Sequence, residues 1–166
     1  FAYSEDAMAL KPSVGLPPAF PALLALQRAF LSDRTQVSIL VQALLATLVC
    51  GMIFAIGFEL LGPLGAAVAA LAYALDPTAV LCGLKVSHET LFSLFLVLGA
   101  WGATLAFKHD RLWAWAWAGG AFGLAALTWY DGLLFWMPVA LGMTLWRRRS
   151  APGVYLARLA MFLVCF

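Results

Sequence analysis

The sequence predicts an all-α protein, a polytopic bundle of transmembrane helices. Of its 166 residues, 64% are hydrophobic and only 11% are charged, whereas soluble domains carry about 25% charged residues. The mean hydropathy is +0.95. Its apolar runs are near the length of about 20 residues that a helix needs to cross a hydrocarbon core about 30 Å thick. We therefore expect an integral membrane protein that is solvated mainly by lipid.

Residues 1–35 are expected to form an extracytoplasmic first loop rather than a span. Prolines interrupt this segment repeatedly, and the apolar run at residues 22–31 is too short to cross a bilayer. An amphipathic helix on the outer leaflet, with Gln27 and Arg28 toward the lipid headgroups, is the natural interpretation. Phe20, flanked by prolines, is expected to anchor this helix to lipid.

Residues 36–166 are expected to hold the transmembrane helices. The first span is residues 37–61, and Gly62 and Pro63 make a tight turn after it. The following run, residues 64–75, ends at Asp76, because a residue before proline disfavours the α region. This run is short, so it must be buried among neighbours or continue irregularly through residues 78–84.

The remaining elements are separated by polar residues or turn residues. The expected spans are residues 90–107, 112–128, 133–146 and a last one from about Val154, with a turn at residues 129–132. The chain starts without the basic segment of a signal peptide and stops within an apolar run. We expect an internal piece of a larger membrane protein.

The cations predict the orientation of the bundle. Arg147, Arg148 and Arg149 form the strongest positive cluster, and positive loops stay in the cytoplasm. Counting spans backwards places Lys108 and Arg111 on the same side. The opposite, extracytoplasmic face then receives residues 1–35, the loop at residues 76–89 and the turn at residues 129–132.

This topology gathers most of the acidic residues at one face. Six of the eight lie there: Glu5, Asp6, Asp33, Asp76, Glu89 and Asp131. Two interpretations stay open. The acids simply decorate loops away from the anionic inner leaflet, or they line a site that binds a divalent cation or acts as a base.

Other features exclude some classes of function. The net charge of +2 is small, which argues against a nucleic-acid partner. The three cysteines, Cys50, Cys82 and Cys165, have no metal-binding spacing and are expected to be small core residues. The alternating Trp113, Trp115 and Trp117 are expected to form an aromatic belt at the inner boundary of the membrane.

The densest cluster of chemical groups lies at residues 85–92. Lys85, His88 and Glu89 stand where the chain enters the span at residues 90–107. Burying one such charged group in hydrocarbon costs about 3 kcal/mol on insertion scales. They therefore indicate a membrane interface with a chemical function.

Four stretches, in order, resemble the polytopic glycosyltransferases of the GT-C superfamily, in the branch of protein O-mannosyltransferases and aminoarabinose transferases. Tyr3, Ala7 and Leu10 are similar to the pattern Y-x-x-x-A-x-x-L. Residues 17–26 are similar to P-P-G-Y-P-L-L-L-A-L, and residues 87–92 are similar to S-E-T-L-F with a histidine inserted. Residues 123–128 are similar to G-L-A-x-L-T.

The chain also departs from the family pattern. Trp129 stands where the family often has arginine, Ala19 replaces a glycine, and Asp76 precedes Pro77 where an aromatic residue is commoner. The family's catalytic aspartate lies a few residues before its tyrosine motif, a position that here falls before Phe1. Glu5 and Asp6 are the nearby substitutes, and we expect this piece alone to be inactive.

The resemblance implies a polyprenyl-phosphate sugar donor, an unknown acceptor, and a site facing outside a bacterial inner (plasma) membrane. Glu89, with Glu5 and Asp6, would be the catalytic carboxylates. His88, Lys85, Tyr3 and Asp131 would bind substrate, and Glu89 with His88 would hold a divalent metal ion if one is present. Each has a plainer interpretation. Glu89 is also suited to a helix start, His88 and Lys85 to a solvated interface, and Asp76 and Asp131 to turns.

A transporter or a non-catalytic membrane subunit is the alternative class. One-sided acids and proline-broken helices also occur in proton-coupled carriers. A carrier would place charges near the middle of the membrane, but residues 90–107 have none, and the chain shows no internal repeat. The sequence therefore favours the enzyme.

Overall fold

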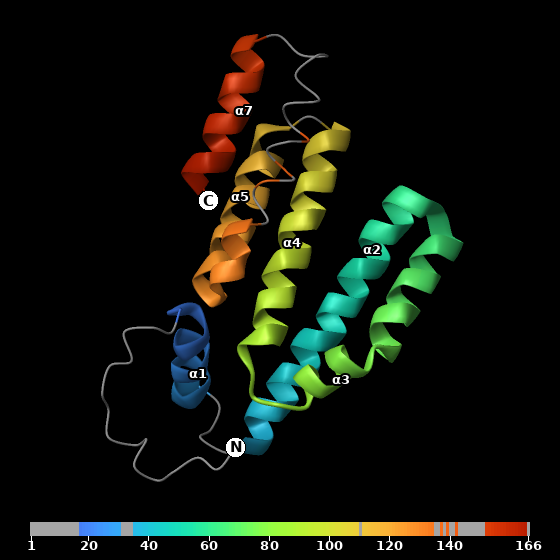
Figure 1. Cartoon of the computed structure of the whole chain (residues 1–166), viewed down its shortest axis with the longest axis vertical. Helices are drawn as coiled ribbons and strands as arrows, with labels where there is room; N and C mark the ends of the chain where they lie inside the picture. The colour runs from blue at the N-terminus through green and yellow to red at the C-terminus, as the bar shows by residue number, and fades with distance from the viewer. Residues whose placement is uncertain are drawn as a thin grey trace.

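The computed structural model describes residues 17–30, 35–109, 111–134, 137, 139, 142 and 152–165. Within these residues there are helices and no strand, which confirms the predicted all-α class (Figure 1). The elements are α1 (Ala19–Phe30), α2 (Thr35–Leu75), α3 (Pro77–Gly83), α4 (His88–His109), α5 (Leu112–Thr128), the 3₁₀ helix η2 (Tyr130–Leu134) and α7 (Pro152–Cys165). By length and composition, α2 and α4 can each cross a membrane, and α1, α5 and residues 156–165 are shorter apolar helices.

Helix α2 is a hairpin of two arms, as the Gly62–Pro63 pair predicts. Gly62 has φ 78° and ψ −178°, a conformation open mainly to glycine, and the chain reverses direction there (Figure 1). The arms approach closely because small residues face each other. A Cβ added to Gly57 would lie 2.8 Å from the Cα of Ala66. Cys50 Sγ also donates to the carbonyl of Ala70 at 3.5 Å.

The second arm of α2 continues into α3 rather than being buried. Leu64 and Leu75 are 79% and 70% exposed within the described structure, so burial among neighbours is the wrong alternative. The continuation past Asp76 is a regular short helix instead of an irregular segment. Asp76 caps α3 by accepting a hydrogen bond from the amide of Thr78 at 3.1 Å.

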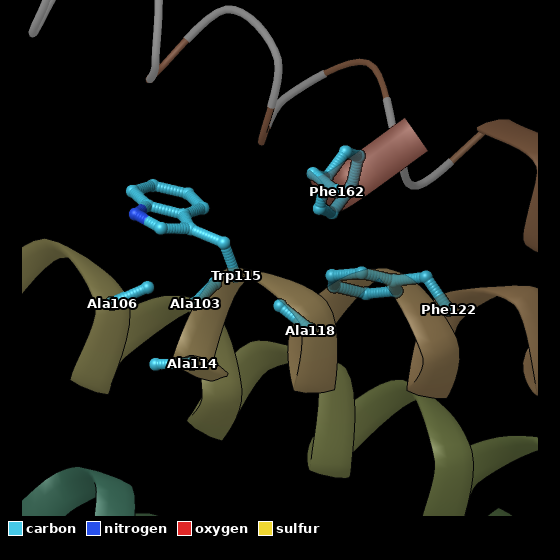
Figure 2. Packing of buried hydrophobic residues seen from close by; sticks show 7 residues of the cluster. All are labelled: Ala103, Ala106, Ala114, Trp115, Ala118, Phe122 and Phe162. Carbon is cyan, nitrogen blue, oxygen red and sulfur yellow. The ribbon is translucent and has the colours of Figure 1, made fainter. Parts of the chain in front are cut away.

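Helices α4 and α5 pack through small residues and form the main core (Figure 2). Ala103 and Ala106 of α4 face Ala114 and Ala118 of α5, all of them buried. Small residues let helices approach closely, which is the usual basis of packing between membrane helices. Phe162 of α7 closes this cluster, with its ring centroid 6.4 Å from that of Phe122.

One member of the predicted tryptophan belt belongs to this core instead. Trp115 is 1% exposed, and its ring meets Phe107 edge-on at 4.8 Å and 85°. Trp113 and Trp117 are about half exposed, as a belt requires. Trp115 differs because it is on the face of α5 that carries the alanines, so helix packing covers it.

The first described helix is α1, which starts three residues before the predicted apolar run, at Ala19. Arg28 is exposed, but the expectation for Gln27 is wrong. Gln27 is 6% exposed, and its Nε2 donates to Ser38 Oγ at 2.7 Å. This hydrogen bond ties α1 to the start of α2. Residues 1–16 and 31–34, and most of the expected span at residues 133–146, lie outside the described residues.

The bundle has two polar ends (Figure 1). One end carries the Gly62 turn, Arg111 and an ion pair between Lys108 and Glu59. The other end gathers α1, α3, the start of α4 and the turn after α5. The predicted division of the loops between two ends is therefore the one that the helices adopt.

The close approach within α2 leads to a first prediction. Gly57→Ala places its new Cβ against the backbone of Ala66, and overpacking of this kind costs about 1–3 kcal/mol. We expect a lower melting temperature of the purified protein in detergent. Gly51→Ala is the matched control, because its Cβ would meet nothing within 4 Å. Equal stability of the two variants would contradict the packing of the hairpin.

Candidate active site

Three of the sequence stretches that resemble family motifs meet where α4 begins. Phe20 comes from α1, His88 from the first turn of α4, and Trp129 directly follows the third stretch at the end of α5. The His88 ring stacks on Trp129, with centroids 4.2 Å apart and planes 14° apart. Phe20 meets the other side of this cluster, 6.1 Å from His88 at 77°. Phe20 therefore packs on the candidate site, and its expected role as a lipid anchor is wrong.

The start of α4 holds Glu89 through local hydrogen bonds. The amide of Glu89 donates to Ser87 Oγ at 3.2 Å, and Ser87 Oγ donates to Glu89 Oε2 at 3.3 Å. Glu89 lies in the first turn of α4, where the helix dipole stabilises an anion. The plainer interpretation of Glu89 as a helix-start residue therefore has a structural basis, and its further role depends on what surrounds it.

A second hydrogen bond to Glu89 comes from Cys82, at the end of α3. Its thiol donates to Glu89 Oε2. Burial raises the pKa of the Cys82 thiol to about 11, with the hydrogen bond to Glu89 and the charge of Glu89 as further causes. The thiol is thus protonated near neutral pH and can act as a donor. The sequence analysis placed Cys82 among core residues, and only the return of the chain after α3 brings it to the carboxylate.

Gln42 of α2 is another residue that the sequence analysis missed. It is 2% exposed, and its Nε2 donates to the carbonyl of Ser87 at 3.0 Å, across 45 residues of sequence. Thr90 Oγ1 adds a bond to the carbonyl of Cys82 at 3.1 Å. The start of α4, which carries Glu89, is thus tied to both α2 and α3. The sequence does offer a signal for Gln42, because it is an amide side chain within an apolar span, where polar residues usually have a function.

A pocket on one side of Glu89 brings together three of the predicted site residues. Its volume is about 260 Å³, and it is lined by His88, Glu89, Phe92, Trp129 and Asp131. Asp131 is held at this pocket by Trp129, whose Nε1 donates to Asp131 Oδ2 at 2.9 Å. The turn expected at residues 129–132 is the 3₁₀ helix η2, and it serves to present this carboxylate.

A second pocket lies on the other side of Glu89, between α2, α3 and α4. It has a volume of about 200 Å³ and is lined by Tyr73, Asp76, Thr78, Ala79, Cys82, Glu89, Thr90 and Ser93. Asp76, predicted as a turn residue, is the cap of α3 and also lines this pocket. Glu89 is the residue that the two pockets share.

The remaining predicted site residues are not brought into these pockets. Lys85 is exposed in the loop between α3 and α4 and lines neither pocket. Its positive charge offsets only a part of the rise in the pKa of the Cys82 thiol. Tyr3, Glu5 and Asp6 lie outside the described residues. Their predicted roles in substrate binding and catalysis stay predictions.

The described residues do not form a metal site by themselves. They contain no group of three or more His, Cys, Asp or Glu side chains placed to hold an ion. Glu89 Oε2 already accepts hydrogen bonds from Cys82 and Ser87, and the His88 ring is stacked on Trp129. The predicted pair of Glu89 and His88 is therefore an incomplete ligand set, and no chemical step is assigned to a metal.

The described helices thus form a bundle that carries one carboxylate, Glu89, between two pockets at one end. The chain matches the family model described as dolichyl-phosphate-mannose-protein mannosyltransferase over residues 16–166. It belongs to this family of glycosyltransferases, which confirms the resemblance drawn from its motifs. No curated protein and no solved structure matches the chain.

The tie between Gln42 and Ser87 leads to a second prediction. Gln42→Leu keeps the size of the side chain but removes the bond to the Ser87 carbonyl. Because a misplacement of about 1 Å can cost about 100-fold in rate, we expect kcat for sugar transfer to fall by roughly ten- to a hundredfold with KM little changed. Thr47→Val is the control, since Thr47 bonds only to its own helix at Ala43. An unchanged kcat in Gln42→Leu would show that the loop holds its position without α2.

Proposed function

We propose that this protein is a GT-C-type glycosyltransferase that moves a sugar from a polyprenyl-phosphate donor to a lipid, glycan or protein acceptor. Membership of the family supports the transferase activity, and the family description names dolichyl phosphate mannose as donor and protein as acceptor. The observation that carries the proposal is the position of Glu89 between two pockets, where three motif stretches meet.

Glu89 is proposed as the general base. The acceptor hydroxyl oxygen forms a bond to the anomeric carbon of the sugar, and the bond from that carbon to the phosphate oxygen breaks. The polyprenyl phosphate leaves with the electron pair, and the hydroxyl proton passes to the Glu89 carboxylate. The hydrogen bonds from Ser87 and Cys82 fix Oε2 and leave Oε1 to face the substrate. Holding the carboxylate in advance of the reaction is what makes such a base effective.

The groove between α4 and α5 supports a lipid-linked donor. His88, Phe92 and Phe95 share one face of α4, because they are spaced by four and three residues. His88 and Phe92 line the pocket at Glu89. Phe95 lines an apolar pocket of about 670 Å³ together with Trp117 and Leu124 of α5. A polar pocket with an apolar pocket about one helical turn further along α4 fits an amphiphile whose head reacts and whose chain lies along the helices.

The phosphate of the donor requires positive charge, because Glu89 and Asp131 share the same pocket. We propose that Lys85 supplies it as a point charge from the loop, that His88 binds the phosphate, and that Asp131 and Tyr3 contact the substrate. Glu5 and Asp6 are proposed as further carboxylates of the site. A divalent cation at Glu89 and His88 would neutralise the phosphate in the same way, and its other ligands would come from outside the described residues.

We further propose that this end of the bundle faces outside the cytoplasm, in a bacterial inner membrane. The third prediction tests the orientation with single cysteines in a variant that lacks Cys50, Cys82 and Cys165. Tyr130 and Arg111 are both exposed and lie at opposite ends of α5. We expect Tyr130→Cys to react with an impermeant maleimide in intact cells and Arg111→Cys to react only after permeabilisation. The reverse pattern would invert the topology.

The fourth prediction tests the base. Glu89→Gln keeps the size of the side chain and removes its charge, so we expect sugar transfer to fall by about 100-fold or more. Insertion and abundance should not change. Glu59→Gln is the matched control, because Glu59 is paired with Lys108 at the opposite end of the bundle. Wild-type turnover in Glu89→Gln would reduce Glu89 to a helix-start residue.

A further inference from the structure

We propose that the pocket between α2, α3 and α4, on the far side of Glu89 from Trp129, binds a single sugar ring. This proposal rests on the proposed function, and it assigns to that function a subsite most of whose lining lies outside the motif stretches. The pocket lining differs in kind from that of the other pockets. It presents the hydroxyls of Tyr73, Thr78 and Ser93 together with the carboxylates of Asp76 and Glu89.

The hydroxyls in this pocket are available to a ligand. Helical Thr47, Thr104 and Thr128 each donate to the carbonyl four residues earlier in their own helix. Ser93 lies on α4 like Thr104, yet its hydroxyl makes no hydrogen bond with any described residue. The same holds for the hydroxyls of Tyr73 and Thr78 within the described part of the chain. Each hydroxyl can both donate and accept, which matches the hydroxyls of a sugar.

The size and the elements of the pocket fit one ring. A volume of about 200 Å³ is below the range of about 300–1,000 Å³ that holds drug-sized ligands. The three hydroxyls come from three different helices, so a ring in the pocket would be held from several sides. Asp76 is fixed by its cap on Thr78, which leaves its second oxygen to accept from a ring hydroxyl.

The pocket also lies where the reaction needs a sugar. Glu89 lines both this pocket and the pocket at Trp129. A ring bound here has the proposed base at its edge, with the pocket at Trp129 on the other side of the same carboxylate. The sugar is either that of the donor or that of a glycan acceptor, and both have the same hydroxyl chemistry.

The experiment uses the purified full-length protein and the variants Tyr73→Phe and Ser93→Ala, each of which removes one hydroxyl. The first arm compares binding of polyprenyl-phosphate mannose with binding of polyprenyl phosphate, which lacks the sugar. The second arm measures binding of methyl α-mannopyranoside in the presence of saturating polyprenyl-phosphate mannose. Thr104→Ala is the matched control on α4, because Thr104 bonds only to its own helix at Ala100.

We expect each variant to weaken the sugar-dependent binding by roughly two- to tenfold, the effect of one lost hydrogen bond, with Thr104→Ala unchanged. A loss confined to polyprenyl-phosphate mannose identifies the donor sugar, and a loss confined to the pyranoside identifies an acceptor glycan. Unchanged binding in both arms, or an equal loss for polyprenyl phosphate, overturns the subsite. The proposed function would still stand in that case if Glu89→Gln abolished transfer. Conversely, absence of transfer by the wild type would refute the function, while a sugar-dependent change in binding would still support the pocket.

Discussion

The structure depends on the hydrogen bonds that a few polar side chains make between helices in an otherwise apolar bundle. Hydrocarbon offers no hydrogen bonds, so a polar side chain has to find a partner in the protein or stay at a helix end. Here the start of α4 is held by three such bonds: Gln42 donates to the carbonyl of Ser87, Cys82 donates to Glu89, and Thr90 donates to the carbonyl of Cys82. Together these bonds hold the beginning of α4 against α2 and α3.

This arrangement has a consequence for the candidate chemistry. A carboxylate that is held at one oxygen keeps its second oxygen in a fixed direction, and Glu89 is held in this way between two pockets. The packing of α4 on α5 supplies the other half of the site, because it carries Trp129 to His88. Alanines and glycines let α4 and α5 pack closely, and this packing leaves little room for one helix to shift along the other. The residues at the helix ends are therefore held in fixed positions relative to each other.

Trp129 shows how a departure from the family pattern can be accommodated. The family often has arginine at this position, and the tryptophan here covers the His88 ring and donates to Asp131. An indole N–H supplies one donor without a charge. Trp129 therefore gives this carboxylate a donor and brings no positive charge, and Lys85 and His88 are the residues proposed to bind the donor phosphate.

The all-α class, the turn at Gly62, the ends of α4 and α5 and the division of the polar loops between two ends could all be predicted from the sequence. Each depends on local chemistry: runs of apolar residues, a glycine–proline pair, and charges that must stay out of hydrocarbon. Glu89, His88 and Asp131 could also be selected this way, because ionisable residues beside apolar helices are conspicuous. The sequence could not show that Asp131 reaches the pocket through the indole of Trp129.

Only the tertiary structure decided which polar groups meet. Gln27 bonds to Ser38 instead of facing lipid, Trp115 enters the core instead of a belt, and Cys82 reaches Glu89. These outcomes depend on the rotation of each helix about its axis and on which helices are neighbours. Helices that are apolar on all sides carry little periodic signal for that rotation, so it follows from the fit of small residues such as Gly57 against Ala66, which becomes visible only when the helices are packed.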